Sequence, residues 1–513
     1  MKRVSILNNV VGPVMRGPSS SHTAGPWRIA RTAADLLGGH VRSATIAFHP
    51  SSSLAVCYHD QRSDLAFASG LLRRSLTDSD FGDALRLAPG EGLDIRFEAR
   101  PFPEADHPNS ALLELTGERG GKIVLHSRST GGGSFEIASL DGYPVRITGE
   151  SFEVLVQCDG DAAPAVLELL ERSMASSSRT DGPEGALCRG SSATPPSEAM
   201  VRSLRSHEGV RRVLRSDPVM FPLKGRAICR SMDELAAFAY AEGLSLGRAG
   251  LACEAALLGM SEDETMRAMD GYLDVMLGSV ALGLSDDLPP MRLLRPMAAS
   301  IHEAERSGRL FTGGPHARAA IRALAAMHAS SAGGAVCAAP TGGSAGVLPG
   351  VAATLLEDMG RSREEVLLAL WAAGAVGWGH DTESTFAAEV AGCQVEIGMA
   401  GAMGAAAVTE AGGGTAGQAC DAAAIVLQNV MGSVCDLVQG VVEVPCHSRN
   451  AALASQALLC ADLILGGFEN PVPLGETIQA VDSVGRMLPE ELRCTSRGGL
   501  ALCPSALRMK KLQ

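Results

Sequence analysis

Aromatic side chains are scarce in this chain of 513 residues: Phe, Trp and Tyr together make up 4 % of it. Glycine is plentiful instead, with 59 residues. Because glycine lets backbone segments approach each other closely, we expect tightly packed helices and a site built from glycine-containing loops.

Long apolar runs and export signals are also missing. The longest apolar candidate, residues 366–378, is too short and too rich in Ala and Gly to span a bilayer. Residues 1–3 lead into a short strand-like run and not into the apolar core of a signal peptide. The sequence therefore predicts a cytoplasmic protein without a membrane segment.

Positive charge is in deficit, since the formal net charge is −13 at pH 7. This excess of negative charge argues against binding to nucleic acids or to anionic membranes. The thirteen cysteines, without an export signal, indicate free thiols or metal ligands and not disulfides. The sequence therefore favours a small-molecule partner over a nucleic acid or a membrane.

The chain changes character twice along its length. Its first part mixes short alternating strands with helices, such as a helix at 28–39 and a strand at 43–50. A strand and a helix follow at 151–173, and the Ser-, Gly- and Pro-rich stretch at 174–200 has the composition of a linker. From Met232 onward the pattern is helical almost throughout.

These changes predict an α+β N-terminal domain followed by a larger all-α domain. The expected bounds are 1–150 for the α+β domain and 231–513 for the helical domain. Between them, 151–230 is interpreted as a degenerate regulatory βα unit with its linker.

Two loops carry an unusual density of hydrogen-bonding groups. The first lies between Gly17-Pro18 and Gly25-Pro26, and the second precedes an apolar helix. Their hydroxyls and backbone N–H groups suit a small anion such as a carboxylate, although a turn or helix cap that satisfies itself is the alternative. The candidate binding residues are Ser19, Ser20, Ser21, His22 and Thr23 in the first loop, and Thr341, Gly342, Gly343 and Ser344 in the second.

Cys393, Cys435 and Cys446 lie in glycine- or proline-marked segments of the helical part. None belongs to a CxxC pair, so a zinc finger is not expected, and they do not form the tight run of four that holds an electron-transfer cluster. Three separated thiolates can hold three irons of a [4Fe–4S] cluster and leave the fourth iron open as a Lewis acid. The alternative is that all three pack as small hydrophobic side chains.

Several motifs, in order, resemble those of the iron-sulfur-dependent L-serine dehydratases, in the form whose β and α parts are fused in one chain. They are GPSSSHTAGP, STGGGSFEI, AAPTGGSAGVLPG, GCQVEIG, CDLVQGVVEVPC with Arg449-Asn450 two residues beyond it, and LPEELRCTSRGGLA. The resemblance implies a [4Fe–4S] cluster on Cys393, Cys435 and Cys446, with the serine-rich loop reaching over it to bind substrate. It also implies β-elimination of water from L-serine, giving pyruvate and ammonia, and we expect a homodimer.

The sequence departs from that family where the general base is expected. Gln61 stands at the position of the family's histidine, and an amide cannot accept a proton from carbon. His59, two residues earlier, lies on the same face if the segment is a strand, so we predict His59 as the base. His107 and Asn109 match another polar motif of the β part and remain candidates.

A second departure concerns the end of the chain. Cys503 is followed by ten more residues, whereas some relatives finish with a cysteine that reaches the open iron. We therefore do not expect the tail to cap the cluster here.

Gln61 also keeps other functions open. The same machinery could act on another β-hydroxy amino acid or on cysteine, with Gln61 shaping the pocket. A different alternative is a catalytically silent regulatory relative. The intact cysteine trio argues against that alternative, because a silent protein has no need of an oxygen-sensitive cluster.

Overall fold

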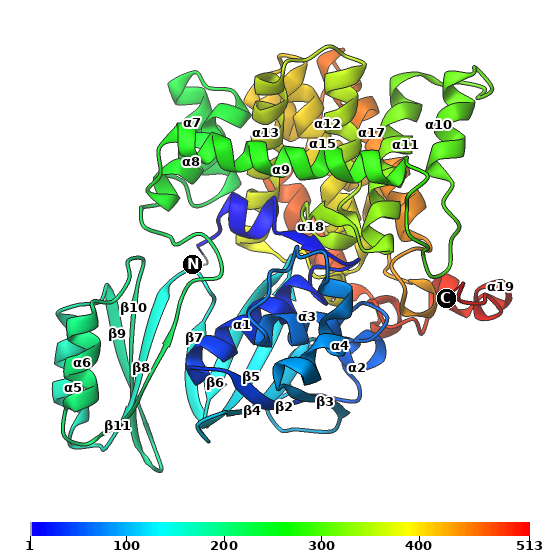
Figure 1. The fold of residues 1–513 in the computed structure, drawn as a ribbon. Coiled ribbons are helices and arrows are strands. Elements are labelled where there is room, and N and C mark those ends of the chain that lie inside the picture. The colour runs from blue at the N-terminus through cyan, green and yellow to red at the C-terminus, as the bar shows by residue number, and fades with distance from the viewer. Residues whose placement is uncertain (1–2, 513) are drawn as a thin grey trace.

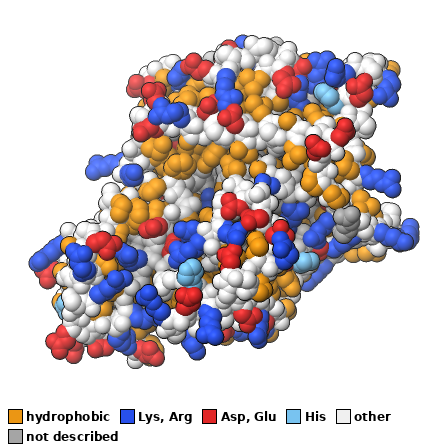
Figure 2. Space-filling model, viewed as in Figure 1, with side chains coloured by type: hydrophobic (Ala, Val, Ile, Leu, Met, Phe, Trp, Pro, Cys, Tyr) orange, Lys and Arg blue, Asp and Glu red, His pale blue; other side chains and the backbone are white. Residues whose placement is uncertain are grey.

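The computed structural model describes residues 3–512 and divides into two main layers, an α+β part and a helical part above it (Figure 1). The expected fold class, an α+β N-terminal region followed by a larger helical region, is confirmed. Among the described residues, no helix is both long and apolar enough to cross a membrane. Charged side chains of both signs intermingle on the face drawn in Figure 2.

A six-stranded sheet in the order β3-β2-β4-β5-β6-β7 forms the floor of the α+β part. Strands β2 and β3 pair in parallel and the other neighbours are antiparallel. Helices α1 (Ala24–Leu37) and α3 (Ser63–Leu71) pack against each other, and α1 also packs on the sheet. The strands are β2 (Val41–Phe48), β3 (Asp94–Ala99), β4 (Ser110–Gly117), β5 (Lys122–Gly131), β6 (Ser134–Leu140) and β7 (Tyr143–Ile147).

A second, four-stranded sheet follows, in the order β11-β8-β10-β9 and covered by two helices. Its β-α-β-β-α-β succession is that of a ferredoxin-like unit, with a core of its own that includes Val156, Val166 and Leu170. The elements are β8 (Phe152–Cys158), α5 (Ala163–Glu171), β9 (Ser176–Gly182), β10 (Gly185–Ser192), α6 (Glu198–Ser206) and β11 (Val210–Ser216).

The linker prediction for 174–200 is therefore wrong, and the unit is not degenerate. Strand β10 pairs with the apolar strand β8 from Ala186 to Ser192, and its Ala186, Leu187 and Cys188 are buried. Strand β9, rich in serine, lies at the sheet edge, where polar side chains face solvent. Strand pairing and a neighbouring apolar strand supply the core that the composition of this stretch does not indicate.

The helical part is built around α15 (Ile397–Ala411), which packs against four other helices. Glycine and alanine dominate α15, and a Cβ at Gly404 would lie 3.1 Å from the Cβ of Ala457, so the expected close packing is present here. The other long helices are α7 (Met232–Glu242), α8 (Leu246–Leu258), α9 (Glu262–Gly283), α10 (Ala298–Arg306), α11 (Gly314–Ala332), α12 (Val347–Glu357), α13 (Arg363–Glu383), α16 (Ala416–Val430), α17 (Cys446–Leu465) and α18 (Leu474–Met487).

The beginning of the chain belongs to the helical part. Strand β1 (Val14–Arg16) pairs with β12 (Ala335–Cys337). Upstream, the Ser5 hydroxyl donates to the buried Glu254 carboxylate at 2.5 Å, which also accepts the Ile6 and Leu7 N–H groups. This N-terminal arm, residues 4–16, fixes the point at which the serine-rich loop leaves the helices.

Because the ferredoxin-like unit has its own core, we expect its stability to be independent of the helical part. Truncating Leu170, which is fully buried, by Leu170→Ala should cost about 2–5 kcal/mol and act mainly on this unit. Hydrogen exchange should therefore accelerate across residues 152–216 and stay unchanged in α15. Equal acceleration in both regions would contradict an independent core.

Candidate active site

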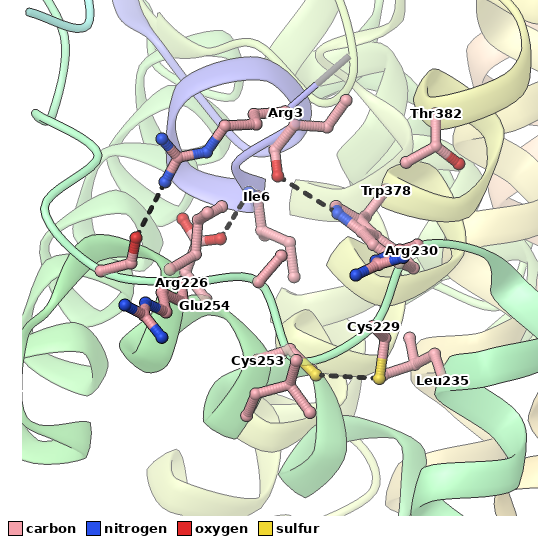
Figure 3. A pocket seen from close by; sticks show the side chains of 16 residues that line it. Arg3, Ile6, Arg226, Cys229, Arg230, Leu235, Cys253, Glu254, Trp378 and Thr382 are labelled. Carbon is pink, nitrogen blue, oxygen red and sulfur yellow. Dashed lines mark hydrogen bonds between the residues drawn. The ribbon is translucent and has the colours of Figure 1, made fainter. Parts of the chain in front are cut away.

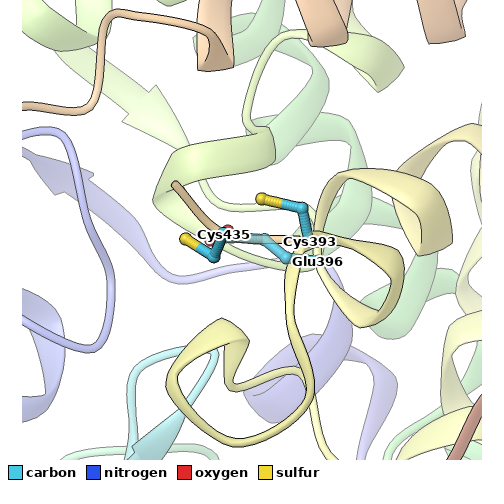
Figure 4. Close-up of side chains that lie close together, drawn as sticks. All are labelled: Cys393, Glu396 and Cys435. Carbon is cyan, nitrogen blue, oxygen red and sulfur yellow. The ribbon is translucent and has the colours of Figure 1, made fainter. Parts of the chain in front are cut away.

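Three segments of the helical part carry buried thiols, and the close group of potential metal ligands unites two of them, Cys393 and Cys435, without Cys446. Cys393 begins a short 3-10 turn and Cys446 begins α17, while Cys435 lies in the loop between α16 and α17. Their exposed fractions are 2 %, 4 % and 2 %, respectively. Cys393 and Cys435 place their sulfur atoms within 4.8 Å of each other and of a Glu396 carboxylate oxygen (Figure 4).

The surroundings of these thiols disfavour a free thiolate. The pKa of Cys393 is raised well above its ordinary value by a hydrogen bond with the Cys435 thiol and by burial. Burial likewise raises the pKa of Cys446. Arg449 acts in the opposite direction, with Nη1 3.5 Å from the Cys393 sulfur. A bound metal deprotonates its thiol ligands, so these thiols are better suited to a metal than to free ionisation.

Two residues of this cluster were missed by the sequence reasoning. The Cys494 N–H donates to the Cys435 carbonyl at 2.9 Å, and the two thiols hydrogen-bond each other. Cys494 also has a φ of +61°, a region that non-glycine residues seldom adopt. Glu396 accepts a hydrogen bond from the Thr341 hydroxyl at 2.6 Å. Cys494 lies within the motif LPEELRCTSRGGLA noted above. The sequence spacing of Cys494 or Glu396 from Cys435 does not indicate that these residues lie together.

The two predicted anion-binding loops meet beside the thiols. The Ser20 hydroxyl accepts a hydrogen bond from the Gly342 N–H at 3.1 Å. Thr341 and Ser344 also cap their own turn, so the self-satisfying alternative holds for part of that loop. Because Thr341 reaches Glu396 as well, the second loop bridges the serine-rich loop and the cysteine segment.

Glu389, in the short helix α14 (Ala388–Ala391), is the buried carboxylate on which the first loop converges. Its Oε1 accepts hydrogen bonds from the Ser21 hydroxyl at 2.8 Å and from the Asn109 side chain at 3.3 Å. His22 Nδ1 lies 3.5 Å from the same oxygen. Glu389 stands four residues before Cys393, so the serine-rich loop lies close to the thiols.

A glycine-rich turn makes room for this convergence. The Gly131–Gly133 hairpin between β5 and β6 has positive φ at all three residues, and a Cβ at Gly131 would lie 3.0 Å from the Ala387 nitrogen. The backbone of the STGGGS motif therefore packs directly on the segment that carries Glu389.

The histidine candidates are placed very differently. His22 and Thr23 are fully buried, and the Thr23 hydroxyl donates to the Gln61 carbonyl at 3.4 Å. His107 is partly buried, and its Nδ1 accepts the Asn109 N–H at 3.1 Å. Burial lowers the pKa of His107, while Glu389 acts to raise it.

His59 lies at the surface. Its segment is not a strand but a turn after the helix α2 (Ser53–Cys57). The prediction that His59 lies on the same strand face as position 61 is therefore wrong. The His59 side chain is 75 % exposed, and its Nδ1 lies 2.7 Å from Asp64 Oδ2. Gln61, in contrast, is buried and donates to the Gly440 carbonyl at 3.2 Å. His59 as the base stays a prediction that this geometry does not favour.

A separate cavity of about 570 Å³ lies beside the N-terminal arm (Figure 3). Cys229 and Cys253 line it, with their sulfur atoms 3.6 Å apart, as do Glu254 and Trp378. None of the residues lining this cavity belongs to the loops or the thiol cluster described above.

Comparison with known proteins agrees with this geometry. The model of the family described as serine dehydratase alpha chain matches residues 173–501. The probable L-serine dehydratase alpha chain of Bacillus subtilis (strain 168) is 35 % identical over 282 residues, which cover 55 % of this chain and 94 % of that protein. The L-serine dehydratase alpha chain of Peptoniphilus asaccharolyticus is 36 % identical over 242 residues, covering 47 % of this chain and 83 % of that protein.

The chain belongs to the serine dehydratase alpha-chain family. It is also similar to the probable L-serine dehydratase beta chain of B. subtilis, with 36 % identity over 156 residues, or 30 % of this chain and 69 % of that protein. In this family member Cys503 packs near Val438 and Val441, and the metal-competent group among residues 3–512 does not include it.

Glu396 makes the stability of this family member depend on pH. Burial raises the pKa of Glu396 to about 7, against the opposing hydrogen bond from Thr341. Because the folded-state pKa exceeds the unfolded one, ionising Glu396 lowers stability as the pH rises from about 4.5 to 7.

In the cluster-free protein, Glu396→Gln should therefore increase the free energy of unfolding by roughly 2 kcal/mol more at pH 8 than at pH 5. Denaturant titrations at the two pH values measure this difference. An equal effect at both would show that Glu396 ionises normally.

Proposed function

We propose that the protein dehydrates L-serine to pyruvate and ammonia at a [4Fe–4S] cluster bound by Cys393, Cys435 and Cys446. The observation that carries the proposal is the meeting of buried thiols with two hydroxyl-rich loops, one from each half of the chain. The names of the similar proteins support L-serine as the substrate.

The donor set supports an iron-sulfur group. Thiolates are the usual ligands of such clusters, and the sulfur atoms of Cys393 and Cys435 are within coordinating distance of one metal centre. Cys446 lies outside that close group, but burial first, and then the neighbouring Cys393 and Glu396, raise its pKa. With one iron free of protein sulfur, the bound cluster supplies a Lewis acid that activates the β-hydroxyl as a leaving group.

The chain's own residues bind and orient the substrate. The Ser19 and Ser20 hydroxyls and the Gly343 N–H are the donors for the substrate carboxylate, because the Ser21 and Thr23 hydroxyls and the Gly342 N–H already donate within the protein. The hydrogen bond between Ser20 and Gly342 holds the two loops in register. Burial of both loops excludes bulk water, which strengthens these polar contacts.

Gln61 supports a second candidate within the same chemistry, a different β-hydroxy amino acid or cysteine, because it replaces the histidine expected there. Pyruvate or keto-acid release from a panel of amino acids decides between them. The homodimer and the cytoplasmic location stay predictions.

The cysteine assignment is tested by three variants and one comparison. Cys393→Ser, Cys435→Ser and Cys446→Ser should each abolish the visible iron-sulfur absorbance under anaerobic conditions. Cys494→Ser should keep the absorbance, because the proposal gives Cys494 no iron. Full cluster retention in any of the first three variants, or loss only in Cys494→Ser, would overturn the ligand set.

A further inference from the structure

A continuous line of polar contacts runs through the buried site and joins Ser53, His22 and Glu389. His22 Nε2 lies 3.1 Å from the Ser53 hydroxyl, and His22 Nδ1 faces the Glu389 carboxylate at 3.5 Å. The Ser19 hydroxyl lies 3.1 Å from the same Nδ1. All three members of the line are buried, so the contacts are shielded from water.

The carboxylate decides which nitrogen of His22 carries the proton. A negative charge beside Nδ1 favours an N–H there, and Ser19 can accept that hydrogen. Nε2 is then the acceptor, and the Ser53 hydroxyl donates to it. Burial lowers the pKa of His22, with Glu389 acting against it, so the ring begins neutral and able to accept a proton.

We assign Ser53 to the substrate because its helix contacts the segment that carries the thiols. Ser53 and Glu389 each keep 6 % of their surface exposed, and His22 keeps none. One turn further along α2, Cys57 lies under Gly440, where an added Cβ would come 3.5 Å from the Cys57 Cβ. Gly440 stands between Cys435 and Cys446, so the helix that carries Ser53 rests on the thiol segment.

The alternatives for a base are less well placed. Gln61 has no basic nitrogen, and His59 points to Asp64 at the surface. His107 Nδ1 is occupied by the Asn109 N–H. Only His22, among these histidines, joins a hydroxyl on one side to a carboxylate on the other.

We propose that Ser53, His22 and Glu389 act as a proton relay that removes the substrate's α-proton, in place of the histidine missing at position 61. This inference rests on the proposed function. It uses the same order of hydroxyl, imidazole and carboxylate that serves acyl transfer elsewhere, here for proton abstraction.

The step balances without any added reactant. The Ser53 proton moves to His22 Nε2 as the Ser53 oxygen takes the α-proton. The electron pair of the broken C–H bond forms the Cα–Cβ double bond, and the C–O bond breaks with departure of hydroxide. Proton transfer from the His22 imidazolium then converts the hydroxide to water, and Glu389 stabilises the cation while it exists.

Four variants test the relay in the cluster-loaded enzyme: Ser53→Ala, Ser53→Thr, His22→Gln and Glu389→Gln. Ser53→Ala and His22→Gln should lower kcat by about 10²–10⁴-fold, with little change in KM or in the cluster absorbance. Glu389→Gln should lower kcat by a smaller factor. Ser53→Thr, which keeps the hydroxyl, should restore most of the loss.

An isotope effect separates proton transfer from structural damage. With L-serine deuterated at the α-carbon, the primary isotope effect on kcat should rise in Ser53→Ala and His22→Gln. Ser51→Ala and His40→Gln are matched controls, because both side chains are exposed and lie outside the relay. Their kcat and isotope effect should equal those of the parent.

The outcomes distinguish the relay from the function on which it rests. A parent that releases no pyruvate overturns the proposed function and the relay with it. If the parent is active, the relay alone is overturned when Ser53→Ala and His22→Gln keep kcat within threefold of the parent's value. It is also overturned when these variants lose activity without a larger isotope effect. The relay alone is also overturned if the larger isotope effect appears in His59→Gln or His107→Gln instead.

Discussion

One buried carboxylate joins the two halves of this protein at its site. Glu389 belongs to the helical half, yet its hydrogen bonds come from Ser21 and Asn109 of the α+β half. A buried carboxylate is costly unless its oxygens are satisfied, so the position of the serine-rich loop follows from Glu389. Because the thiol segment begins four residues later, satisfying Glu389 also brings the loop close to the thiols.

The N-terminal arm makes this closure a property of a single chain. Pairing of β1 with β12, and the hydrogen bonds to Glu254 upstream, anchor residues 4–16 among the helices. The chain then crosses to the α+β half through the loop that binds Glu389. The glycine hairpin at Gly131–Gly133 supports the crossing from the other side. Sequence-distant segments thereby reach one site.

The fold class, the two loops and the buried thiols could be predicted from the sequence, because each has a local signature. The strands β9 and β10 could not, since their stability comes from pairing with β8 and not from their own composition. Glu389 and Cys494 were missed because their partners stand far away in the sequence. His59 was misplaced because a five-residue helix precedes it. The alternation of side chains along a strand, on which the prediction relied, does not reveal such a helix.

The central claim is that an iron-sulfur cluster with one iron free of protein sulfur lies beneath the serine-rich loop. Mössbauer spectroscopy of the 57Fe-loaded protein, with and without L-serine, tests this claim most directly. The account predicts that L-serine changes the signal of one iron in four and leaves the other three unchanged. A spectrum that L-serine does not alter, or one without a four-iron cluster, would contradict it.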